Sequence, residues 1–516
     1  MPCTWAGEFA GPSEPGAEIS LPRGDRSLGW LRNAALTLSF ALLLLVAVAG
    51  ASAAKPGLGP RGWAPGNLPV SLSSAVVTAV LWVAYLLGAL AVALGLWRGV
   101  DSDHRWPRAH SWFWPVALGA LALLTAPIGS ADHINYAAYG RIAAQGGDPY
   151  LVAPLTWAGG ADPVTRAVEA PWTMTPSVYG PFGTTLQRLS SLVGQDNLRQ
   201  TVWVWQLLIV AAWLLVRLLL RRMAFDDEAR ARVDLLWTTN PVVFGVAVLG
   251  AHVDLIATAL ALAAVFLAAR RPWIAGLLLG ATVSTKITYG VVGLAIVWSW
   301  RSLAPRPLVR KLTALIVSSL AVFVSLHIMA GPHVFDQLRK AANGVSLATA
   351  WRPVVNLLSA VLPLAEARTV VSVAAVIAVI VLVWVLSRLV SSRATTQTIS
   401  TTQQTHSAMA ATFVLATAYA LGAPYALPWY DVLTWATLPL MAGSALDGIL
   451  LARLTVMAMA YVPGRVVAMS PDVESLTLGF RKILGPAAAW LVWLAIARVA
   501  RRGWSQVRAT SPPPAS

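Results

Sequence analysis

The sequence predicts an all-α membrane protein that crosses the bilayer many times. Of its 516 residues, 57% are hydrophobic and only 12% are charged, whereas an ordinary soluble domain carries about 25% charged residues. Many apolar runs are roughly 18 residues or longer, which is enough for a helix to cross the hydrocarbon layer. The basic residues behind the net charge of +16 cluster at the ends of these runs, as the positive-inside bias predicts.

This clustering explains the basic balance without a nucleic-acid partner, so we expect the lipid bilayer to be the main surroundings of the chain. The only cysteine is Cys3, which excludes an internal disulfide framework and any multi-cysteine metal site.

The chain begins with a Pro- and Gly-rich polar stretch, which predicts a disordered cytoplasmic leader over residues 1–28. A first span is expected near 30–51. Small residues at its end resemble a signal-peptidase site, but the full-width apolar run favours an uncleaved span. Spans near 71–97 and 111–129 follow. The bases between these two spans should be cytoplasmic and are Arg98, Arg105 and Arg108. The N-terminus is then inside, and the next loop is outside.

That loop, residues 131–198, is the longest polar interval in the chain. It carries three Lys or Arg residues against five Asp or Glu residues, a low basic density that fits an extracytoplasmic side. It is also rich in Tyr, Trp, Pro and Gly, which suits an ordered surface at the bilayer boundary. We therefore expect a long outer loop with interfacial helices that holds the active site.

The remainder of the chain alternates between apolar runs and basic clusters. Residues 233–250 and 253–269 should form a tight hairpin with Gly250 to Asp254 at its outer tip. The segment 272–300 is too long for one span, and two short or re-entrant helices that meet at Lys286 would satisfy its flanking charges. The remaining spans are expected near 200–220, 312–330, 369–390, 408–423, 429–443, 447–463 and 483–500. The total is about fourteen crossings, with both termini inside.

This pattern divides the chain into two membrane modules. The N-terminal module covers 29–390, and a Thr-, Gln- and Ser-rich stretch over 391–407 should be a flexible cytoplasmic linker. The C-terminal module covers 408–502, and a disordered tail is expected over 503–516.

Polar groups at the span edges gather on one predicted side of the membrane. Asp132, His252, Asp254 and Lys286 all fall at the outer face, together with the aromatic loop 425–431. An acid, a histidine, a lysine and aromatic rings at one depth suit general base catalysis, anion binding and sugar stacking. Each group also has a purely structural interpretation. Asp132 could cap a helix, His252 and Asp254 could pair with each other, Lys286 could extend to the interface, and the aromatics could form an interfacial belt.

Several motifs in this order resemble one family, the actinobacterial polyprenol-phosphomannose-dependent α-1,6-mannosyltransferases, which belong to the GT-C class of integral-membrane glycosyltransferases. The resemblance covers about residues 110–440. It departs from the family pattern at Val253-Asp254, where Asn-Asp is usual, and at Val178, where the family has Pro. The motifs that carry it are Asp132…Tyr136…Gly140…Gly147-Asp148-Pro149-Tyr150, Ser177-Val178-Tyr179-Gly180-Pro181, Asn240-Pro241, Gly250-Ala251-His252-Val253-Asp254 and Pro428-Trp429-Tyr430.

The resemblance implies a GT-C-like fold and a polyprenyl-monophosphate sugar as donor. The enzyme would transfer a mannosyl or related residue to a glycan or glycolipid acceptor outside the cytoplasmic membrane, with inversion and with an α-1,6 linkage. Asp132 matches the family's candidate general base. We expect the donor or acceptor to contact His252, Asp254, Lys286, Tyr179, Arg352, Trp429 and Tyr430.

The leaving phosphate is already charged, so a nearby cation could stabilise it, and the sequence shows no close-spaced acidic cluster typical of a metal–nucleotide site. Neither a metal nor a cofactor is therefore expected, although His252 and Asp254 could supply two metal ligands. Two rival functions remain. A transporter or flippase of lipid-linked glycans should place its charges near the bilayer midplane, and a scaffolding subunit should have no outer cavity.

Overall fold

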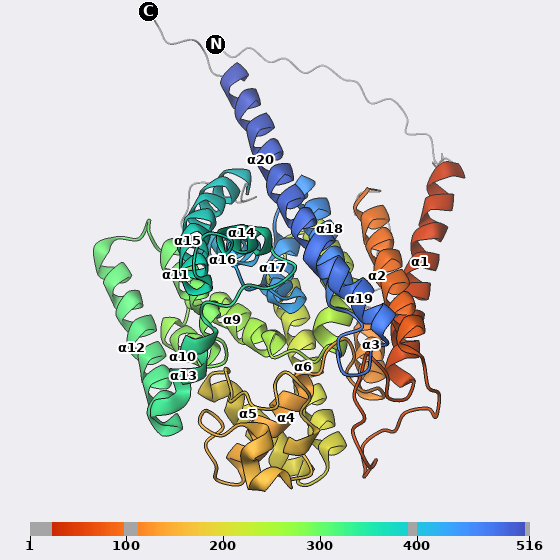
Figure 1. Cartoon of the computed structure of the whole chain (residues 1–516). Coiled ribbons are helices and arrows are strands. Elements are labelled where there is room, and N and C mark those ends of the chain that lie inside the picture. The colour runs from red at the N-terminus through yellow and green to blue at the C-terminus, as the bar shows by residue number, and fades with distance from the viewer. Residues whose placement is uncertain (1–22, 98–111, 391–399, 511–516) are drawn as a thin grey trace, which may run out of the picture.

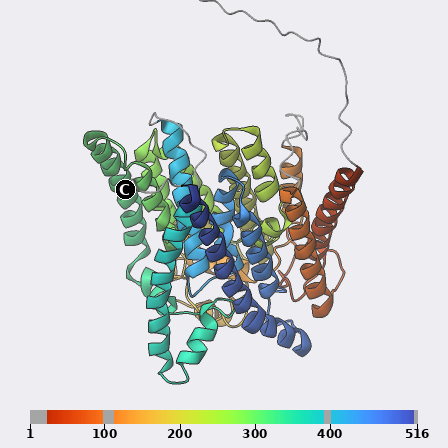
Figure 2. The ribbon, with the colours of Figure 1, turned by 90° about the horizontal axis from the view of Figure 1, so that it is seen from above.

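The computed structural model describes residues 23–97, 112–390 and 400–510. Across these residues the structure is helical, and the only β-pairing is one isolated bridge between Ser52 and Lys55. The long helices form a bundle with α12 at one edge and α1 at the opposite edge, and both views agree on this arrangement (Figures 1 and 2). The predicted all-α polytopic class is confirmed.

The bundle starts with α1 (Arg23–Val48) and α2 (Ser74–Trp97), which pack against each other. Helix α1 begins within the predicted leader 1–28, and residues 1–22 of that leader lie outside the described part. Arg98, Arg105 and Arg108 also lie outside it. The expected span 111–129 is wrong in length, because α3 covers only Phe113–Leu123. Pro127 disfavours helical geometry in the residue before it. Beyond the end of α3, the backbone forms hydrogen bonds with two other segments.

Those backbone pairs hold the start of the outer loop. The Ile128 N–H donates to the Leu249 carbonyl and the Gly129 N–H donates to the Ala54 carbonyl, each at 2.8 Å. The loop then contains helices, as predicted: α4 (Asp132–Ala144) and α5 (Pro181–Gly194) pack against each other and against α6 (Leu198–Met223). Figure 1 shows α4 and α5 side by side at one end of the bundle. Two short 3₁₀ turns lie between them, Pro154–Gly160 and Thr165–Ala167.

The predicted hairpin of 233–250 and 253–269 is wrong. After α7 (Asp227–Val233) and a π-helical turn at Asp234–Thr238, the chain runs through α8 (Pro241–Val243) and η5 (Phe244–Leu249) and then bends by 107° into α9 (Asp254–Ala268).

The helix ends at Gly250, and the bend begins there. The N–H of Gly250 donates to the Gly245 carbonyl at 3.1 Å, and Ala251 takes a positive φ of 54°. A β-carbon at Gly250 would lie 2.2 Å from the Val246 carbonyl oxygen, so only glycine fits here.

The two short helices predicted to meet at Lys286 are confirmed. Helix α10 (Pro272–Val283) ends just before Lys286, and η6 (Ile287–Gly290) and α11 (Val291–Ser299) follow it. Helix α12 (Pro305–Ala330) packs against α10.

The segment after α12 is mostly short turns. It contains η7 (Pro332–Phe335), α13 (Asp336–Ala341) and α14 (Trp351–Leu358), and it leads to the long helix α15 (Leu364–Leu389).

The linker boundary needs correction. Helix α16 covers Thr401–Gly422, and the Ser400 hydroxyl caps it by accepting the Gln403 N–H at 3.1 Å. Residues 401–407 are therefore helical, while 391–399 lie outside the described residues.

The single span expected at 429–443 is also wrong. Prolines break this segment into η8 (Pro428–Asp431), α17 (Val432–Thr437) and η9 (Leu438–Leu440).

The last helices extend further than predicted. Helix α18 (Ala445–Tyr461) agrees with the expected span, but α19 (Pro471–Gly479) continues through η10 (Phe480–Leu484) into α20 (Gly485–Thr510). The expected tail 503–516 is thus helical up to Thr510, and the remaining residues lie outside the described part.

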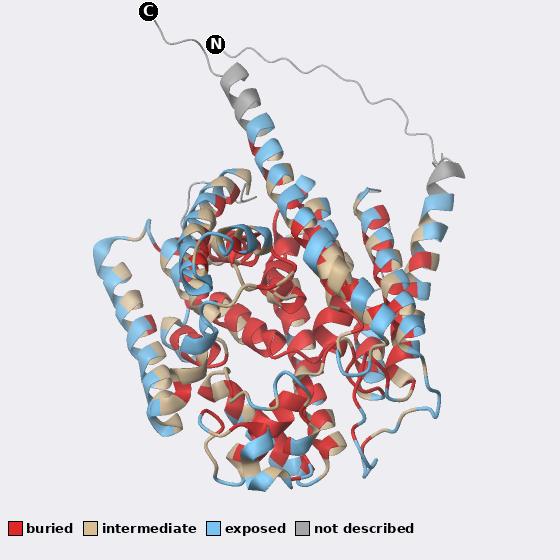
Figure 3. Cartoon of the chain, viewed as in Figure 1, coloured by how far each residue is buried: buried red, intermediate tan, exposed pale blue. Residues whose placement is uncertain are grey.

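By length and composition, six helices among the described residues could cross a membrane, or seven if the bent pair is counted as one span. The exact number of crossings stays a prediction. Figure 3 shows buried residues concentrated in the centre of the bundle, on α9 and α17, while α12 is mostly exposed. Only 6% of the α12 window is buried although it is strongly apolar, which fits a helix that faces lipid.

Candidate functional site

Four separate segments bring the predicted polar residues together. They are the start of α4 with Asp132, the bend before α9 with His252 and Asp254, the turn after α10 with Lys286, and η8 with Trp429 and Tyr430. The links are the pairs Asp132–His252 and Asp254–Lys286, together with ring contacts to the two aromatics. The convergence expected from the sequence is therefore present in the structure.

Asp132 is the first residue of α4, and its carboxylate faces His252. The Oδ2 atom lies 3.4 Å from His252 Nδ1. The N-cap of α4 is Ala131, and the Asp132 N–H donates to the Ser130 hydroxyl at 3.2 Å, so Asp132 is not the capping residue. A carboxylate in the first turn is favourable because it faces the positive end of the helix dipole.

The His252 ring is held in place by Trp429. The two rings stack with centroids 3.7 Å apart and planes 12° apart, and the His252 side chain is only 2% exposed. This contact fixes the direction in which the imidazole faces Asp132.

Asp254 has a different partner. Its Oδ1 atom accepts from Lys286 Nζ at 2.6 Å, and the Tyr289 hydroxyl donates to its backbone carbonyl at 3.2 Å. The Lys286 ammonium also lies 3.6 Å from the centroid of the Tyr430 ring, a cation–π contact. The interpretation in which His252 and Asp254 pair with each other is therefore wrong.

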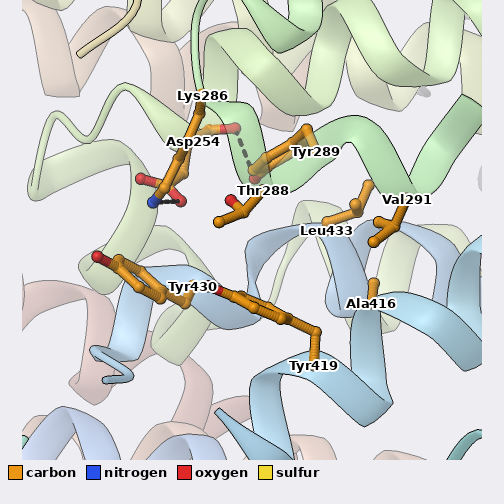
Figure 4. Close-up of a pocket in the computed structure, with 9 residues that line it drawn as sticks. All are labelled: Asp254, Lys286, Thr288, Tyr289, Val291, Ala416, Tyr419, Tyr430 and Leu433. Carbon is orange, nitrogen blue, oxygen red and sulfur yellow. Dashed lines mark hydrogen bonds and ion pairs between the residues drawn. The ribbon is translucent and has the colours of Figure 1, made fainter. Parts of the chain in front are cut away.

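A pocket opens beside this second pair. It is small, with a cavity volume of about 20 Å³. Figure 4 shows Lys286 reaching down to Asp254, with Tyr430 and Tyr419 on the opposite wall. The lining residues are Asp254, Lys286, Thr288, Tyr289, Val291, Ala416, Tyr419, Tyr430 and Leu433.

The motif around Tyr179 fastens the outer loop to the Lys286 turn. The Gly180 N–H donates to the Thr285 carbonyl at 3.2 Å, and the Phe182 N–H donates to the Ser284 carbonyl at 2.9 Å. A β-carbon on Gly180 would lie 2.2 Å from the Ser284 carbonyl oxygen, which explains the glycine. Tyr179 itself packs edge-on against Tyr136, with ring centroids 5.0 Å apart.

Arg352 is the predicted residue that the structure does not link to this cluster. It lies on α14, which packs against α15 and α20. Its neighbour Trp351 donates to the Gly422 carbonyl at 2.7 Å. Among the described contacts, none joins Arg352 to Asp132, Asp254 or Lys286.

Sequence reasoning missed the ion pair that supports η8. Arg453 Nη2 donates to Asp431 at 2.9 Å and to the Ala420 carbonyl at 2.6 Å, and both side chains are buried. A signal was present, because an arginine in the middle of the apolar run 445–461 is expensive and usually functional.

It also missed two buried groups on α4. Burial raises the pKa of Tyr136 well above its usual range, and the carboxylates of Asp132 and Asp254 raise it further. Burial lowers the pKa of His133 to about 3, so this ring is neutral beside Asp132 at physiological pH.

Another missed network secures the entry to α4. Arg465 pairs with Glu169 of the outer loop and donates to the backbone carbonyls of Ser52 and Lys55. It thereby joins the outer loop, the α1–α2 connection and the turn after α18. Within the described residues, no group of three or more His, Cys, Asp or Glu side chains is placed to hold a metal ion.

Comparison with known proteins gives one family. The model for the α-(1→6)-mannopyranosyltransferase N-terminal domain, MptA and B type, matches residues 35–302, slightly more than half of the chain. No solved structure gives a significant match.

Curated relatives agree with the family match. The α-(1→6)-mannopyranosyltransferase A of Mycobacterium tuberculosis is 26% identical over 257 residues, which is 48% of each chain. The α-(1→6)-mannopyranosyltransferase B of Corynebacterium glutamicum is 32% identical over 111 residues, 21% of this chain and 18% of the relative. The chain thus spans less than half the length of either relative.

Proposed function

This chain belongs to the family of α-(1→6)-mannopyranosyltransferases, and we propose that it transfers a mannosyl residue from a polyprenyl-monophosphate donor to a glycan or glycolipid acceptor. The transfer takes place at the outer face of the cytoplasmic membrane and forms an α-1,6 linkage with inversion. The single observation that carries the proposal is the convergence of Asp132, His252, Asp254 and Lys286 from segments far apart in the chain.

Asp132 acts as the general base. An acceptor hydroxyl is a weak nucleophile until its proton is removed in the transition state. The hydroxyl oxygen attacks the anomeric carbon, its proton passes to the Asp132 carboxylate, and the bond from the anomeric carbon to the phosphate oxygen breaks. Attack and departure on opposite faces of the sugar invert the configuration, so a β-linked donor gives an α-linked product.

His252 orients the base. Its Nδ1 atom lies 3.4 Å from the carboxylate, and stacking on Trp429 holds the ring still. Nδ1 makes no hydrogen bond in the structure, and a small approach of the two side chains would form one that keeps a carboxylate oxygen directed at the acceptor.

Lys286 stabilises the leaving phosphate, which departs with the bonding electron pair. The ammonium lies at the edge of the pocket, between Asp254 and the Tyr430 ring. Asp254 holds this cation in place until the donor phosphate arrives.

The test is mannosyl transfer by membranes that contain Asp132→Asn. This substitution keeps the size of the side chain and removes its basicity, so folding should survive while the rate falls about 100- to 10,000-fold. Purified polyprenyl-phosphate mannose, radiolabelled in the sugar, and an oligomannoside acceptor serve as substrates.

Asp148→Asn is the matched control. Asp148 lies in the same outer loop, where its Oδ1 accepts the Tyr150 N–H at 2.8 Å, a bond that asparagine also makes. The control should keep full activity. A folded and fully active Asp132→Asn protein would remove Asp132 from the mechanism.

A further inference from the structure

Several buried polar atoms beside the candidate base have no hydrogen-bond partner, including both ring nitrogens of His133 and Nδ1 of His252. Two others are the hydroxyl of Tyr136 and the Oδ2 atom of Asp254, and both residues are only 1% exposed. More than nine-tenths of buried polar groups are hydrogen-bonded in folded proteins, because leaving one unpaired costs free energy. The Tyr136 hydroxyl can donate a hydrogen bond, and Asp254 Oδ2 can accept one.

The packing of Tyr136 places its ring beside the site. Tyr136 lies four residues after Asp132 on α4, so the two side chains share one face of the helix. Its ring is held between Tyr179, 5.0 Å away, and Trp205, 5.1 Å away. Trp205 Nε1 in turn donates to the Ala251 carbonyl at 2.8 Å, directly before His252.

The electrostatic surroundings support this placement. Both Asp132 and Asp254 act to raise the pKa of Tyr136 beyond the effect of burial. Contacts with the Tyr179 side chain and the Val253 backbone lower the pKa of Tyr136, but neither contact has the geometry of a full hydrogen bond. The group stays protonated and is available as a donor.

We propose that Tyr136 and Asp254 form a subsite for the hydroxyl-bearing edge of a substrate sugar. The Tyr136 hydroxyl donates to one sugar oxygen, and Asp254 Oδ2 accepts from a sugar hydroxyl. A carbohydrate is suited to this pair because each hydroxyl can donate and accept. The subsite rests on the proposed mannosyl transfer and adds two contacts to it that determine which sugar is held beside Asp132.

The neighbouring Tyr139 provides a matched control. It lies about one turn beyond Tyr136 and about two turns beyond Asp132 on the same helix, and its ring also lies near Tyr179, at 6.3 Å. Its hydroxyl, however, donates to the Thr175 carbonyl at 2.9 Å. Tyr136→Phe removes an unpaired hydroxyl, whereas Tyr139→Phe breaks an existing hydrogen bond.

The two substitutions should have opposite effects in the full-length protein in membranes. Tyr136→Phe should leave the melting temperature unchanged or raise it, and should lower kcat/KM about tenfold to a hundredfold. Tyr139→Phe should lower the melting temperature and leave kcat/KM within about twofold. A Tyr136→Phe protein with normal kcat/KM would overturn the subsite.

Deoxy substrates identify the hydroxyl that is bound. Polyprenyl-phosphate donors that each lack one mannosyl hydroxyl form one arm, and acceptors that each lack one hydroxyl form the other. For one of these analogues, the wild-type protein and Tyr136→Phe should show equal kcat/KM, because the missing group leaves nothing for Tyr136 to bind. The arm in which this occurs shows whether the donor or the acceptor occupies the subsite.

A Tyr136→Phe penalty of the same size for every analogue would also overturn the proposal. Failure of the proposed function is a separate result, since the wild-type protein itself would then transfer no mannose. In that case the subsite is tested by binding of polyprenyl-phosphate mannose and of the oligomannoside acceptor to wild-type protein and to Tyr136→Phe, and equal affinities for both ligands would reject it.

Discussion

Substitutions at the buried pair Arg453–Asp431 should separate an effect on stability from an effect on kcat. It sits beneath η8, whose Trp429 stacks on His252 and whose Tyr430 lies under Lys286. The same Arg453 nitrogen also donates to the Ala420 carbonyl near the end of α16. One ion pair therefore fixes the turn that supports both halves of the candidate site.

The magnitudes follow from burial. Both side chains are no more than 6% exposed, so Arg453→Met leaves an uncompensated buried carboxylate and should cost about 3–5 kcal/mol of stability. Replacing both partners, in Asp431→Leu with Arg453→Met, should be neutral or stabilising by about 1–4 kcal/mol. The double variant still loses the restraint on η8, and a displacement of about 1 Å at a catalytic group can lower a rate about 100-fold.

The assay is thermal unfolding in detergent combined with mannosyl transfer by the same preparations. The single variant should be unstable, and the double variant should be stable with kcat reduced about tenfold to a hundredfold. The bidentate pair Arg232–Asp447, with both contacts at 2.9 Å, is the control because it joins α7 to α18 away from the pocket. Arg232→Met with Asp447→Leu also removes the capping box of α18, in which Asp447 accepts the Ser444 N–H at 3.2 Å, so this variant should lose about 0.5–2 kcal/mol of stability and keep kcat. A stable Asp431→Leu/Arg453→Met protein with wild-type kcat would show that the pair does not position the site.

Two other predictions concern the donor phosphate and the topology. Lys286→Met should raise the KM for the polyprenyl-phosphate donor about tenfold to a hundredfold, and combining it with Asp254→Asn avoids an unpaired buried carboxylate. Arg352→Met should leave this KM unchanged. The reverse pattern would move the phosphate site to α14. Cysteines introduced at Ala158 and Thr396 in a Cys3-free background should label from opposite sides of the membrane, and labelling of both by an impermeant reagent from outside would contradict the topology.

Hydropathy and charge were sufficient to predict the helical class and the composition of the cluster. The break around Lys286 was predicted because the segment 272–300 is too long for one span and carries a cation at its centre. Asp132, His252, Asp254 and Lys286 were grouped because the alternation of basic clusters puts them on one side of the membrane. Both inferences need only the order of residues along the chain.

The pairings within the cluster could not be predicted in the same way. Whether His252 faces Asp132 or Asp254 depends on the bend at Gly250, and that bend is closed by backbone hydrogen bonds with no signature in hydropathy. The broken segment around Pro428 was misread for a related reason. A run of apolar residues looks the same whether it is a span or a set of buried turns, and only its packing distinguishes them.

The two acids of the site are distinguished by their partners. Asp254 accepts from a permanent cation, Lys286, at 2.6 Å, while Asp132 faces an imidazole at 3.4 Å. In the proposed mechanism Asp132 is the base, and Asp254 holds Lys286. Because Trp429 supports the imidazole and its neighbour Tyr430 supports the ammonium, a movement of η8 would disturb both roles at once. The proposed roles of Asp132 and Asp254 therefore both depend on the position of η8, which Arg453 on α18 holds in place.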